Sequence, residues 1–242
     1  SVAVISIAAA VHVGILVLEK DLGAALIYFV TYLMMLYVAT MKLRYLAAGA
    51  FAGTAASVVA YQLFAHVRVR VAAWQDPWSN MNQGGYQICQ SLFAIGTGGL
   101  FGMGLGQGMP KSVPVVESDF IFSAIAEEMG VIFCIFLILI YISSFIMFVN
   151  IALKMKKNFY KLCAFGLSVV LIFQVFLSIG GVTKFIPSTG VTLPLISYGG
   201  SSIITTIVIF SIIQGMYVRN RREEVTTNEE QAAINRKSGK RQ

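Results

Sequence analysis

The residues with the clearest potential for chemistry are the acids of one segment, PVVESDFIFSAIAEEMG at residues 114–130. Asp119 stands where an apolar helix is expected to begin, and Glu127 would follow about 80° around that helix and about 12 Å along it. An ionisable side chain so far inside an apolar helix is costly and usually faces a cavity or a partner. We therefore expect Glu127 or its neighbour Glu128 to line a polar cleft. Position alone gives Asp119, or Ser118 beside it, a second interpretation as the cap of the helix.

A glycine-rich segment, GTGGLFGMGLGQG at residues 96–108, precedes these acids. Its glycines would let the backbone turn sharply or approach a ligand closely. It is not a Walker loop, which needs Gly immediately before its Lys, because Pro110 precedes Lys111. Exposed amides of such a segment could still form an anion nest, and Lys111 could help them to hold a phosphate.

The composition is typical of a membrane protein, because 57% of the 242 residues are hydrophobic and only 12% are charged. In an ordinary soluble domain about a quarter of the residues are charged, and several stretches here approach the roughly 20 apolar residues that span a bilayer. The net charge of +7 could indicate nucleic-acid binding, but the Lys and Arg residues form short clusters between apolar stretches. We therefore expect no nucleic-acid partner and interpret the clusters as topology signals.

The apolar stretches predict an all-α fold, a polytopic transmembrane helix bundle. We place six spans at residues 2–18, 22–40, 44–66, 120–149, 160–183 and 201–218. The segments that connect six spans lie alternately on the two sides of the membrane, and most of the basic residues then fall on one side. The positive-inside rule identifies that side as the cytoplasm. These basic residues include Lys42, Arg44, Lys154, Lys156, Lys157, Lys161, Arg219, Arg221 and Arg222. The polar tail, residues 219–242, is expected to be a disordered cytoplasmic extension.

The longest connection, residues 67–119, then lies outside the cytoplasm, and loops of this length usually have a function. Within it, YQICQSLFAIG at residues 86–96 has helical spacing but is too short to cross a membrane. This predicts an interfacial or re-entrant helix. The aromatic residues of WQDPW, Trp74 and Trp78, could anchor the chain at the lipid headgroups.

A second polar interruption, KFIPSTGVTLPLISYGGSS at residues 184–202, joins the last two spans. Its prolines, hydroxyl groups and glycines favour a broken or re-entrant helix. Such backbone is tolerated at membrane depth only where protein or water satisfies its polar groups. The alternative is an ordinary outer turn.

The three cysteines, Cys89, Cys134 and Cys163, match no metal or disulfide spacing and are interpreted as small buried side chains. The chain opens inside an apolar stretch without the basic leader or the cleavage site of a signal peptide. We therefore expect an N-terminally truncated protein.

Four segments in this order, WQDPW, GYQICQSLFAIGTGGLFGMGLGQG, ESDFIFSAIAEEMG and TGVTLPLISYGGSS, resemble motifs of the SEDS family, which includes the FtsW, RodA and SpoVE proteins. The resemblance covers residues 19–218. Family members have about ten spans, so it implies that the predicted six are the last ones and that about four are missing before them. It also implies a peptidoglycan glycosyltransferase that polymerises lipid II into glycan strands at the outer face of the bacterial cytoplasmic membrane. Division, elongation and sporulation remain alternatives for its role.

The resemblance extends to single residues. Asp119 matches the family's essential loop aspartate, and Glu127 matches the first acid of its E-E-[LM]-G pair, which makes both of them catalytic candidates. Lys111 stands where the division members of the family commonly carry a Lys. Many relatives have a Glu where this chain has Val115, and here an acid appears two residues later, at Glu117.

The implied mechanism uses Asp119 as a general base that deprotonates the acceptor GlcNAc 4-hydroxyl as it attacks the donor MurNAc anomeric carbon. Undecaprenyl pyrophosphate then leaves. Its charge must be met by outer cations, with or without a divalent cation such as Mg or Mn between phosphate and Asp119, although no metal-ligand spacing is visible. The substrate-binding candidates are Lys111, Arg68, Arg70, Gln87, Ser197 and Tyr198.

Two other functions remain compatible with these residues. Intramembrane acids and broken segments also suit a transporter or lipid II flippase, although a motif-rich loop on one side suits one-sided chemistry better. A non-catalytic membrane scaffold of a cell-wall synthesis complex is the third alternative. The resemblance implies a class B penicillin-binding transpeptidase as partner, besides lipid II and membrane lipids. Small residues at 47–57 would admit a partner helix or serve packing within the bundle.

Overall fold

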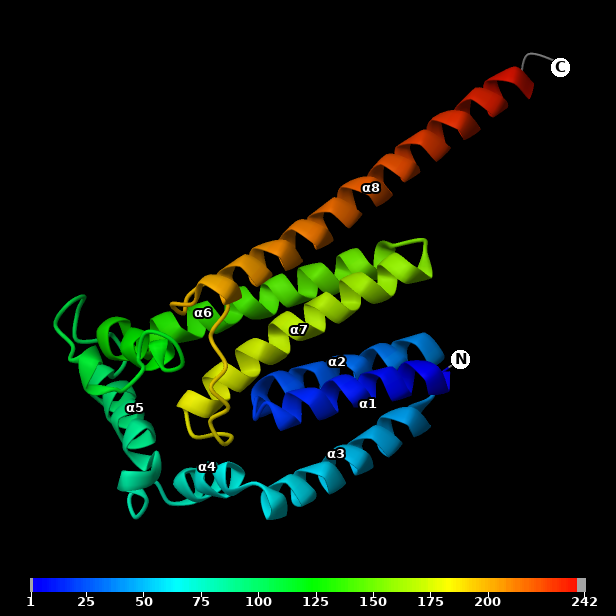
Figure 1. Cartoon of the computed structure of the whole chain (residues 1–242). Helices are drawn as coiled ribbons and strands as arrows, with labels where there is room; N and C mark the ends of the chain where they lie inside the picture. The colour runs from blue at the N-terminus through cyan, green and yellow to red at the C-terminus, as the bar shows by residue number, and fades with distance from the viewer. Residues whose placement is uncertain (1, 239–242) are drawn as a thin grey trace.

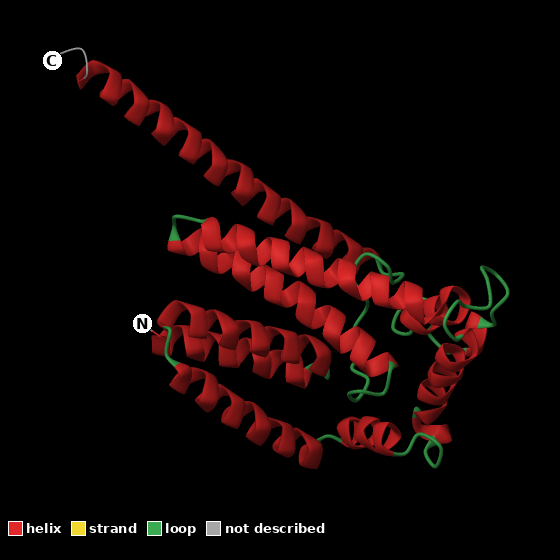
Figure 2. Ribbon diagram, turned by 180° about the vertical axis from the view of Figure 1, so that it is seen from behind, coloured by secondary structure: helices red, strands yellow, loops and turns green. Residues whose placement is uncertain are grey.

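The computed structural model describes residues 2–238, and all regular structure within them is helical. The prediction of an all-α fold is therefore confirmed. The long helices run side by side, while α4, α5 and most of the irregular segments gather at one end of the bundle (Figure 1, and Figure 2 from behind). The elements are α1 (Val2–Leu18), α2 (Leu22–Thr40), α3 (Leu43–Leu63), α4 (Ala65–Gln75), η1 (Met81–Gln83), α5 (Gly85–Gly98), η2 (Pro110–Ser112), α6 (Ile121–Lys154), α7 (Asn158–Val182) and α8 (Gly200–Ser238).

Five of the described helices are long and apolar enough to cross a membrane, namely α2, α3, α6, α7 and the part of α8 from Gly200 to Thr226. They correspond to five of the six predicted spans, as expected of a multi-pass membrane protein. The remaining span, α1, is apolar but has only 17 residues.

The third span ends earlier than predicted, because the helix breaks at Phe64. This residue is extended (φ −106°, ψ 115°), so α3 stops just before it and α4 begins just after it. The Nη1 group of Arg68 donates to the carbonyl of Gln62 at 2.6 Å and thereby satisfies one of the last carbonyls of α3. The predicted range 44–66 therefore contains a span and the start of a second, short helix.

Small residues of α3 serve packing within the bundle. A Cβ on Gly49 would lie 2.2 Å from Cδ1 of Leu33, and one on Gly53 would lie 2.9 Å from Cε1 of Phe29. Both neighbours belong to α2, so these glycines let the two helices approach closely. This supports internal packing as the role of residues 47–57.

Helix α8 continues well beyond its apolar part, to Ser238, so the prediction of a disordered tail is wrong for residues 219–238. Residues 239–242 of that tail lie outside the described residues. Side chains four residues apart support the extension, because Arg219 Nε lies 3.3 Å from Glu223 Oε1. The hydrophobic pattern ends near residue 218, but Arg, Glu, Gln and Ala are strong helix formers and keep the backbone helical.

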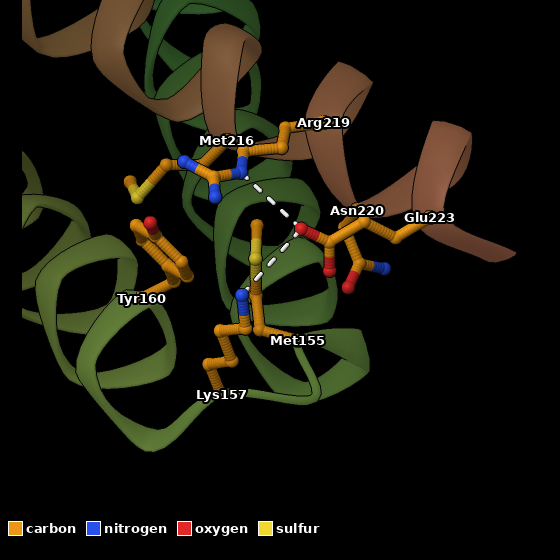
Figure 3. A pocket seen from close by; sticks show the side chains of 7 residues that line it. All are labelled: Met155, Lys157, Tyr160, Met216, Arg219, Asn220 and Glu223. Carbon is orange, nitrogen blue, oxygen red and sulfur yellow. Dashed lines mark hydrogen bonds and ion pairs between the residues drawn. The ribbon is translucent and has the colours of Figure 1, made fainter.

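The same part of α8 is fastened to the turn between α6 and α7, as Figure 3 shows. Lys157 Nζ lies 3.6 Å from Glu223 Oε1, and the Arg219 guanidinium lies over the ring of Tyr160 at 5.1 Å. Exposed ion pairs contribute little stability one by one. The cluster therefore orients α8 against this turn rather than holding the bundle together.

The larger hydrophobic cluster of the core lies where α5 meets α6 and α7, and a smaller one joins α6, α7 and α8. Ser91 of α5 donates to the carbonyl of Val182 on α7 at 2.9 Å and shares a 2.6 Å hydrogen bond with Ser123 of α6. Both serines are fully buried. The 14 residues of α5 are too few to cross a membrane, as predicted, and these hydrogen bonds join the helix to the bundle.

Candidate functional site

Asp119 lies in the turn before α6 and not in the helix itself. Phe120 occupies the N-cap position of α6, and no side chain caps the helix. Asp119 and Ser118 therefore do not have the capping role that position alone allows. The backbone N–H of Asp119 donates to the carbonyl of Val115 at 3.2 Å, and Val115 has a φ of 57°. A β-branched residue in the left-handed region is strained, so strain is stored in the turn that places Asp119.

The carboxylate of Asp119 and the guanidinium of Arg70 lie beside the same residue, Gly190. A Cβ on Gly190 would stand 3.5 Å from Asp119 Oδ2 and 4.0 Å from Arg70 Nη2. Arg70 Nη1 also donates to the carbonyl of Thr189 at 3.2 Å. No ion pair joins Asp119 to Arg70 in the part of the chain that the structure describes. The two charges therefore converge on one glycine without neutralising each other by direct contact.

Arg70 belongs to α4, and contacts of Trp74 and Asp76 at the end of this helix fix its position. Trp74 Nε1 donates to the carbonyl of Lys184 at 3.1 Å, so this indole has a packing role besides any contact with headgroups. The turn after the helix is closed by Asp76, whose pKa is lowered by hydrogen bonds from the side chain and the backbone of Ser79. Asp76 therefore keeps its charge while it holds this turn.

Between α7 and α8 runs an irregular segment, residues 183–199, here called the α7–α8 connection. It is fastened to the turn of Asp119 by Ser197, whose Oγ accepts from the backbone N–H of Leu193 at 2.7 Å and donates to the carbonyl of Ser118. The segment is not a helix, and protein groups satisfy this part of its backbone, as irregular structure at membrane depth would require.

A second hydrogen bond lies next to the first. The backbone N–H of Tyr198 donates to the carbonyl of Glu117 at 2.7 Å. The Tyr198 side chain is 79% exposed, whereas Ser197 is only 1% exposed. Of these two predicted substrate-binding residues, only Tyr198 presents its side chain at the surface.

Glu127 lies on α6 and is only 6% exposed. Its Oε1 accepts from the backbone N–H of Met109 at 3.1 Å, at the end of the glycine-rich loop, residues 99–109. Its Oε2 is buried without a hydrogen-bond partner among the described residues, 3.1 Å from where a Cβ on Gly108 would be. The acid that is predicted to line a polar cleft thus packs against the backbone of this loop.

Helix α6 is interrupted at Gly130 (φ 81°, ψ 172°), and the glycine-rich loop fills the interruption. Four backbone hydrogen bonds between the loop and α6 replace the helical ones that the break removes. This exchange satisfies polar groups that would otherwise be unpaired. The hydrogen bonds run from Met103 N to Glu127 O (2.9 Å), Gly104 N to Glu128 O (3.0 Å), Val131 N to Gly99 O (3.0 Å) and Ile132 N to Leu100 O (3.3 Å).

Two glycines at this junction, Gly102 of the loop and Gly130 of α6, are packed closely against protein backbone. A Cβ on Gly102 would lie 2.2 Å from the carbonyl oxygen of Glu128, and one on Gly130 would lie 2.4 Å from the amide nitrogen of Gly102. The N–H groups of Gly102, Met103 and Gly104 all donate to backbone carbonyls. The prediction that the exposed amides of this loop hold a phosphate is therefore wrong for these three groups.

The remaining candidates are spread over the connection between α3 and α6. Lys111 is exposed on η2, Gln87 is half-buried on α5, and Arg68 is engaged by the end of α3. Of the three cations among the substrate-binding candidates, Arg70 is the one that lies beside Asp119 at Gly190. Sequence reasoning does not single out Gly190, and its only signal is its place in the polar interruption at 184–202.

Two features limit the chemistry available elsewhere. Among the described residues no group of three or more His, Cys, Asp or Glu side chains could hold a metal ion. A groove of about 320 Å³ between α6 and α7 is lined almost wholly by apolar side chains, with the hydroxyl groups of Tyr141 and Thr183 as exceptions. It contains no carboxylate and no cation, so the site at Gly190 is the better candidate for acid–base chemistry.

The chain is similar to RodA and FtsW proteins over most of its length. A family model described as cell cycle protein, FtsW/RodA/SpoVE, matches residues 1–222. The peptidoglycan glycosyltransferase RodA of Mycobacterium tuberculosis (strain ATCC 25618 / H37Rv) is 42% identical over 203 residues, which are 84% of this chain and 43% of that protein. The probable peptidoglycan glycosyltransferase FtsW of Geobacter sp. (strain M18) is 34% identical over 220 residues, with coverage of 87% and 58%.

A solved structure is similar as well. It comes from work on the structural coordination of polymerization and crosslinking by a peptidoglycan synthase complex, and it matches with a TM-score of 0.73 and 27% identity over 89% of this chain. The chain spans 61% of that solved chain and 43% of the mycobacterial protein. With a family match over residues 1–222, the chain belongs to the FtsW/RodA/SpoVE family of cell cycle proteins, the SEDS family whose motifs it carries.

Proposed function

We propose that this chain carries the reacting site of a peptidoglycan glycosyltransferase that polymerises lipid II into glycan strands. The observation that carries the proposal is the convergence of a carboxylate, Asp119, and a guanidinium, Arg70, at Gly190. Glycosyl transfer from a pyrophosphate needs both groups, a base for the attacking hydroxyl and a cation for the leaving group. The relatives named peptidoglycan glycosyltransferase RodA and FtsW support the same activity.

In the proposed reaction the 4-hydroxyl of the acceptor GlcNAc attacks the anomeric carbon of the donor MurNAc. The hydroxyl proton passes to the Asp119 carboxylate as the new C–O bond forms. The bond from the anomeric carbon to the pyrophosphate oxygen breaks, and undecaprenyl pyrophosphate leaves with the electron pair. A general base of this kind raises the rate by a factor of about 10² to 10⁴ when it lies within reach of the proton.

Arg70 is the proposed ligand of the departing pyrophosphate. A planar guanidinium can bind phosphate through two parallel N–H groups. Its Nη1 is held by Thr189 and its Nη2 lies beside Gly190, so the group is already oriented toward the site of Asp119. Arg68 is proposed to stabilise the junction of α3 and α4 instead, because its Nη1 is bonded to Gln62.

Three further polar residues are proposed to contact the substrate outside this pair. Lys111 is an exposed cation on η2 and suits a phosphate or a peptide carboxylate. Tyr198 projects from the backbone position that is bonded to Glu117, next to the turn of Asp119. Gln87, on α5, could donate to a sugar hydroxyl or accept from one.

Glu127 is proposed to act through the glycine-rich loop and not on the substrate. Its carboxylate accepts from Met109, which directly precedes the short helix that carries Lys111. It would thereby set the position of Lys111 relative to α6. This role differs from the catalytic role that the family motif implies for it.

A divalent cation is proposed to be held by Asp119 and the substrate together, and not by a cluster of protein ligands. Asp119 is the carboxylate found at Gly190, and Mg²⁺ is usually bound through one or two carboxylates plus substrate phosphates. When bound, Mg²⁺ or Mn²⁺ would supply positive charge to the pyrophosphate. Arg70 offers such charge from the chain itself.

The site is proposed to face the outside of the bacterial cytoplasmic membrane. Lys157 and Arg219 lie at the end of the bundle where α6 turns into α7, away from the end that holds α4 and α5 (Figures 1 and 3). The positive-inside rule assigns the basic end to the cytoplasm. The likeness to a complex of polymerization and crosslinking supports a class B penicillin-binding transpeptidase as partner.

Polymerisation of lipid II by the complete protein with its transpeptidase partner tests the proposal. Asp119→Asn should lower the rate at least about 100-fold, within the range of general base catalysis. Glu117→Gln is the matched control, because it removes an exposed acid two residues away and should keep the rate within about threefold. If the unchanged protein translocates lipid II without forming polymer, it is a flippase instead. If Asp119→Asn polymerises lipid II as fast as Glu117→Gln, the role of Asp119 as a base is contradicted.

A further inference from the structure

The α7–α8 connection meets the turn of Asp119 through adjacent backbone positions. Ser197 bonds to the carbonyl of Ser118, and Tyr198 bonds to the carbonyl of Glu117. These carbonyls belong to the two residues that precede Asp119. A segment that is remote in sequence therefore restrains the backbone that leads into the proposed base.

Ser197 uses its single hydroxyl twice. The oxygen accepts from the backbone N–H of Leu193 at 2.7 Å, and the proton is donated to the carbonyl of Ser118. The carbonyl of Ser118 lies in the same peptide plane as the N–H of Asp119, so holding it restrains the direction in which Asp119 leaves the turn. With 1% exposure, this hydroxyl is too enclosed to touch a sugar or a phosphate.

The same α7–α8 connection also contacts Arg70, the second charged residue of the site. Gly190 lies in it, and Thr189 accepts the hydrogen bond of Arg70. The connection is itself anchored in the core, where Leu193 is fully buried, and the Tyr141 hydroxyl of α6 donates to the carbonyl of Pro194. One anchored segment therefore bonds to Arg70 and lies beside Asp119.

We propose that Ser197 is a positioning residue of the glycosyl-transfer site, whose hydroxyl docks the α7–α8 connection onto the turn of Asp119 and so sets the spacing between Asp119 and Arg70. The inference rests on the proposed function, because it assigns Ser197 a role in that reaction. It replaces the substrate-binding role that the motif predicts for Ser197. A misplacement of about 1 Å in a reacting group can lower a rate about 100-fold, so the docking matters for chemistry more than for binding.

The kinetic test compares Ser197→Ala with Ser168→Ala in the complete protein with its transpeptidase partner. Both serines are buried, but Ser168 Oγ donates to Ala164 within α7 and joins no two segments. Ser197→Ala should lower kcat about 10- to 100-fold and leave KM for lipid II within about threefold, since misplacing the base affects the transition state and not ground-state binding. Ser168→Ala should keep kcat within about threefold, because it removes a buried hydroxyl that bonds only within its own helix.

A cross-link measures the docking without any activity. Glu117 and Tyr198 are backbone partners with exposed side chains. A disulfide can join two such positions when their Cα atoms lie about 4.4–6.8 Å apart. In Glu117→Cys/Tyr198→Cys, oxidation should join the two positions readily, and adding Ser197→Ala should lower the yield at least about threefold. Mass spectrometry distinguishes this cross-link from disulfides of the three native cysteines.

The outcomes separate the inference from the proposed function. A fall in kcat together with a lower cross-link yield supports the positioning role. Unchanged kcat in Ser197→Ala, a loss no larger than that of Ser168→Ala, or an unchanged cross-link yield would overturn it. If instead Asp119→Asn keeps full polymerisation, the proposed function fails, while the cross-link still reports whether Ser197 docks the two segments.

Discussion

Asp119 and Arg70 are 49 residues apart in sequence, yet both place a charged group within 4.0 Å of one point, the position that a Cβ on Gly190 would occupy. Asp119 comes from the strained turn before α6 and Arg70 from α4. The glycine beside both of them belongs to a third segment, the α7–α8 connection. The absence of a side chain at this one position thus leaves room where a carboxylate and a guanidinium converge.

Gly190→Ala should impair this site more than it impairs the fold. The added methyl group would be in van der Waals contact with both charged groups, 3.5 Å from Asp119 Oδ2 and 4.0 Å from Arg70 Nη2, and would displace substrate atoms from that place. The φ of 75° would itself cost about 1–2 kcal/mol with a side chain. We expect polymerisation to fall at least about 10-fold. Gly84→Ala is the control, because Gly84 has a φ of 95° and nothing within 4 Å of its added Cβ. Equal losses in the two variants would mean that backbone strain alone is responsible.

Glu127→Gln and Glu127→Ala should differ in activity. The amide oxygen of Gln can still accept from Met109, whereas Ala removes the acceptor. If Glu127 acts through the loop, Glu127→Gln should keep activity within about 10-fold, and Glu127→Ala should lose more and speed hydrogen exchange at residues 99–109. Complete loss of activity in Glu127→Gln with a protected loop would instead indicate a carboxylate that takes part in catalysis.

Gly130→Ala should destabilise the protein strongly. A Cβ there would lie 2.4 Å from both the amide nitrogen of Gly102 and the carbonyl oxygen of Leu100, so the loop could no longer fill the break in α6. We expect a loss above about 3 kcal/mol in the free energy of unfolding, as for other clashes at special backbone positions. Gly215→Ala on α8, with nothing within 4 Å, should be neutral or stabilise by up to about 1 kcal/mol. Similar thermal stability of the two variants would contradict this account of the break.

The long apolar runs and the candidate base could be predicted from the sequence, because both depend on local pattern. Hydrophobic length places five of the spans, and the motif around Asp119 marks the proposed base. The break at Gly130 could not be predicted, since a single Gly is tolerated inside an apolar helix and the loop that fills the break begins about 30 residues earlier. The glycines of that loop do predict close approach, but the sequence does not say that the neighbour is α6.

Which arginine lies near Asp119 could not be predicted, because it depends on tertiary structure. Arg68 and Arg70 are two residues apart and look equivalent in sequence, yet one bonds to the end of α3 and the other to Thr189, 119 residues away. The tail was mispredicted for a different reason. Its lack of apolar residues indicated disorder, whereas pairs such as Arg219 and Glu223, together with strong helix formers, keep α8 helical beyond residue 218, where the hydrophobic pattern ends.

A double-mutant cycle of Asp119→Asn and Arg70→Lys, measured as the rate of lipid II polymerisation by the complete protein with its partner, tests the joint site most directly. Groups that act on one transition state give non-additive losses. We expect about a 100-fold loss or more for Asp119→Asn, about 10-fold for Arg70→Lys, and a double-variant loss clearly smaller than the product of the two. Losses that multiply fully would show that the two groups act independently, and would contradict a shared site at Gly190.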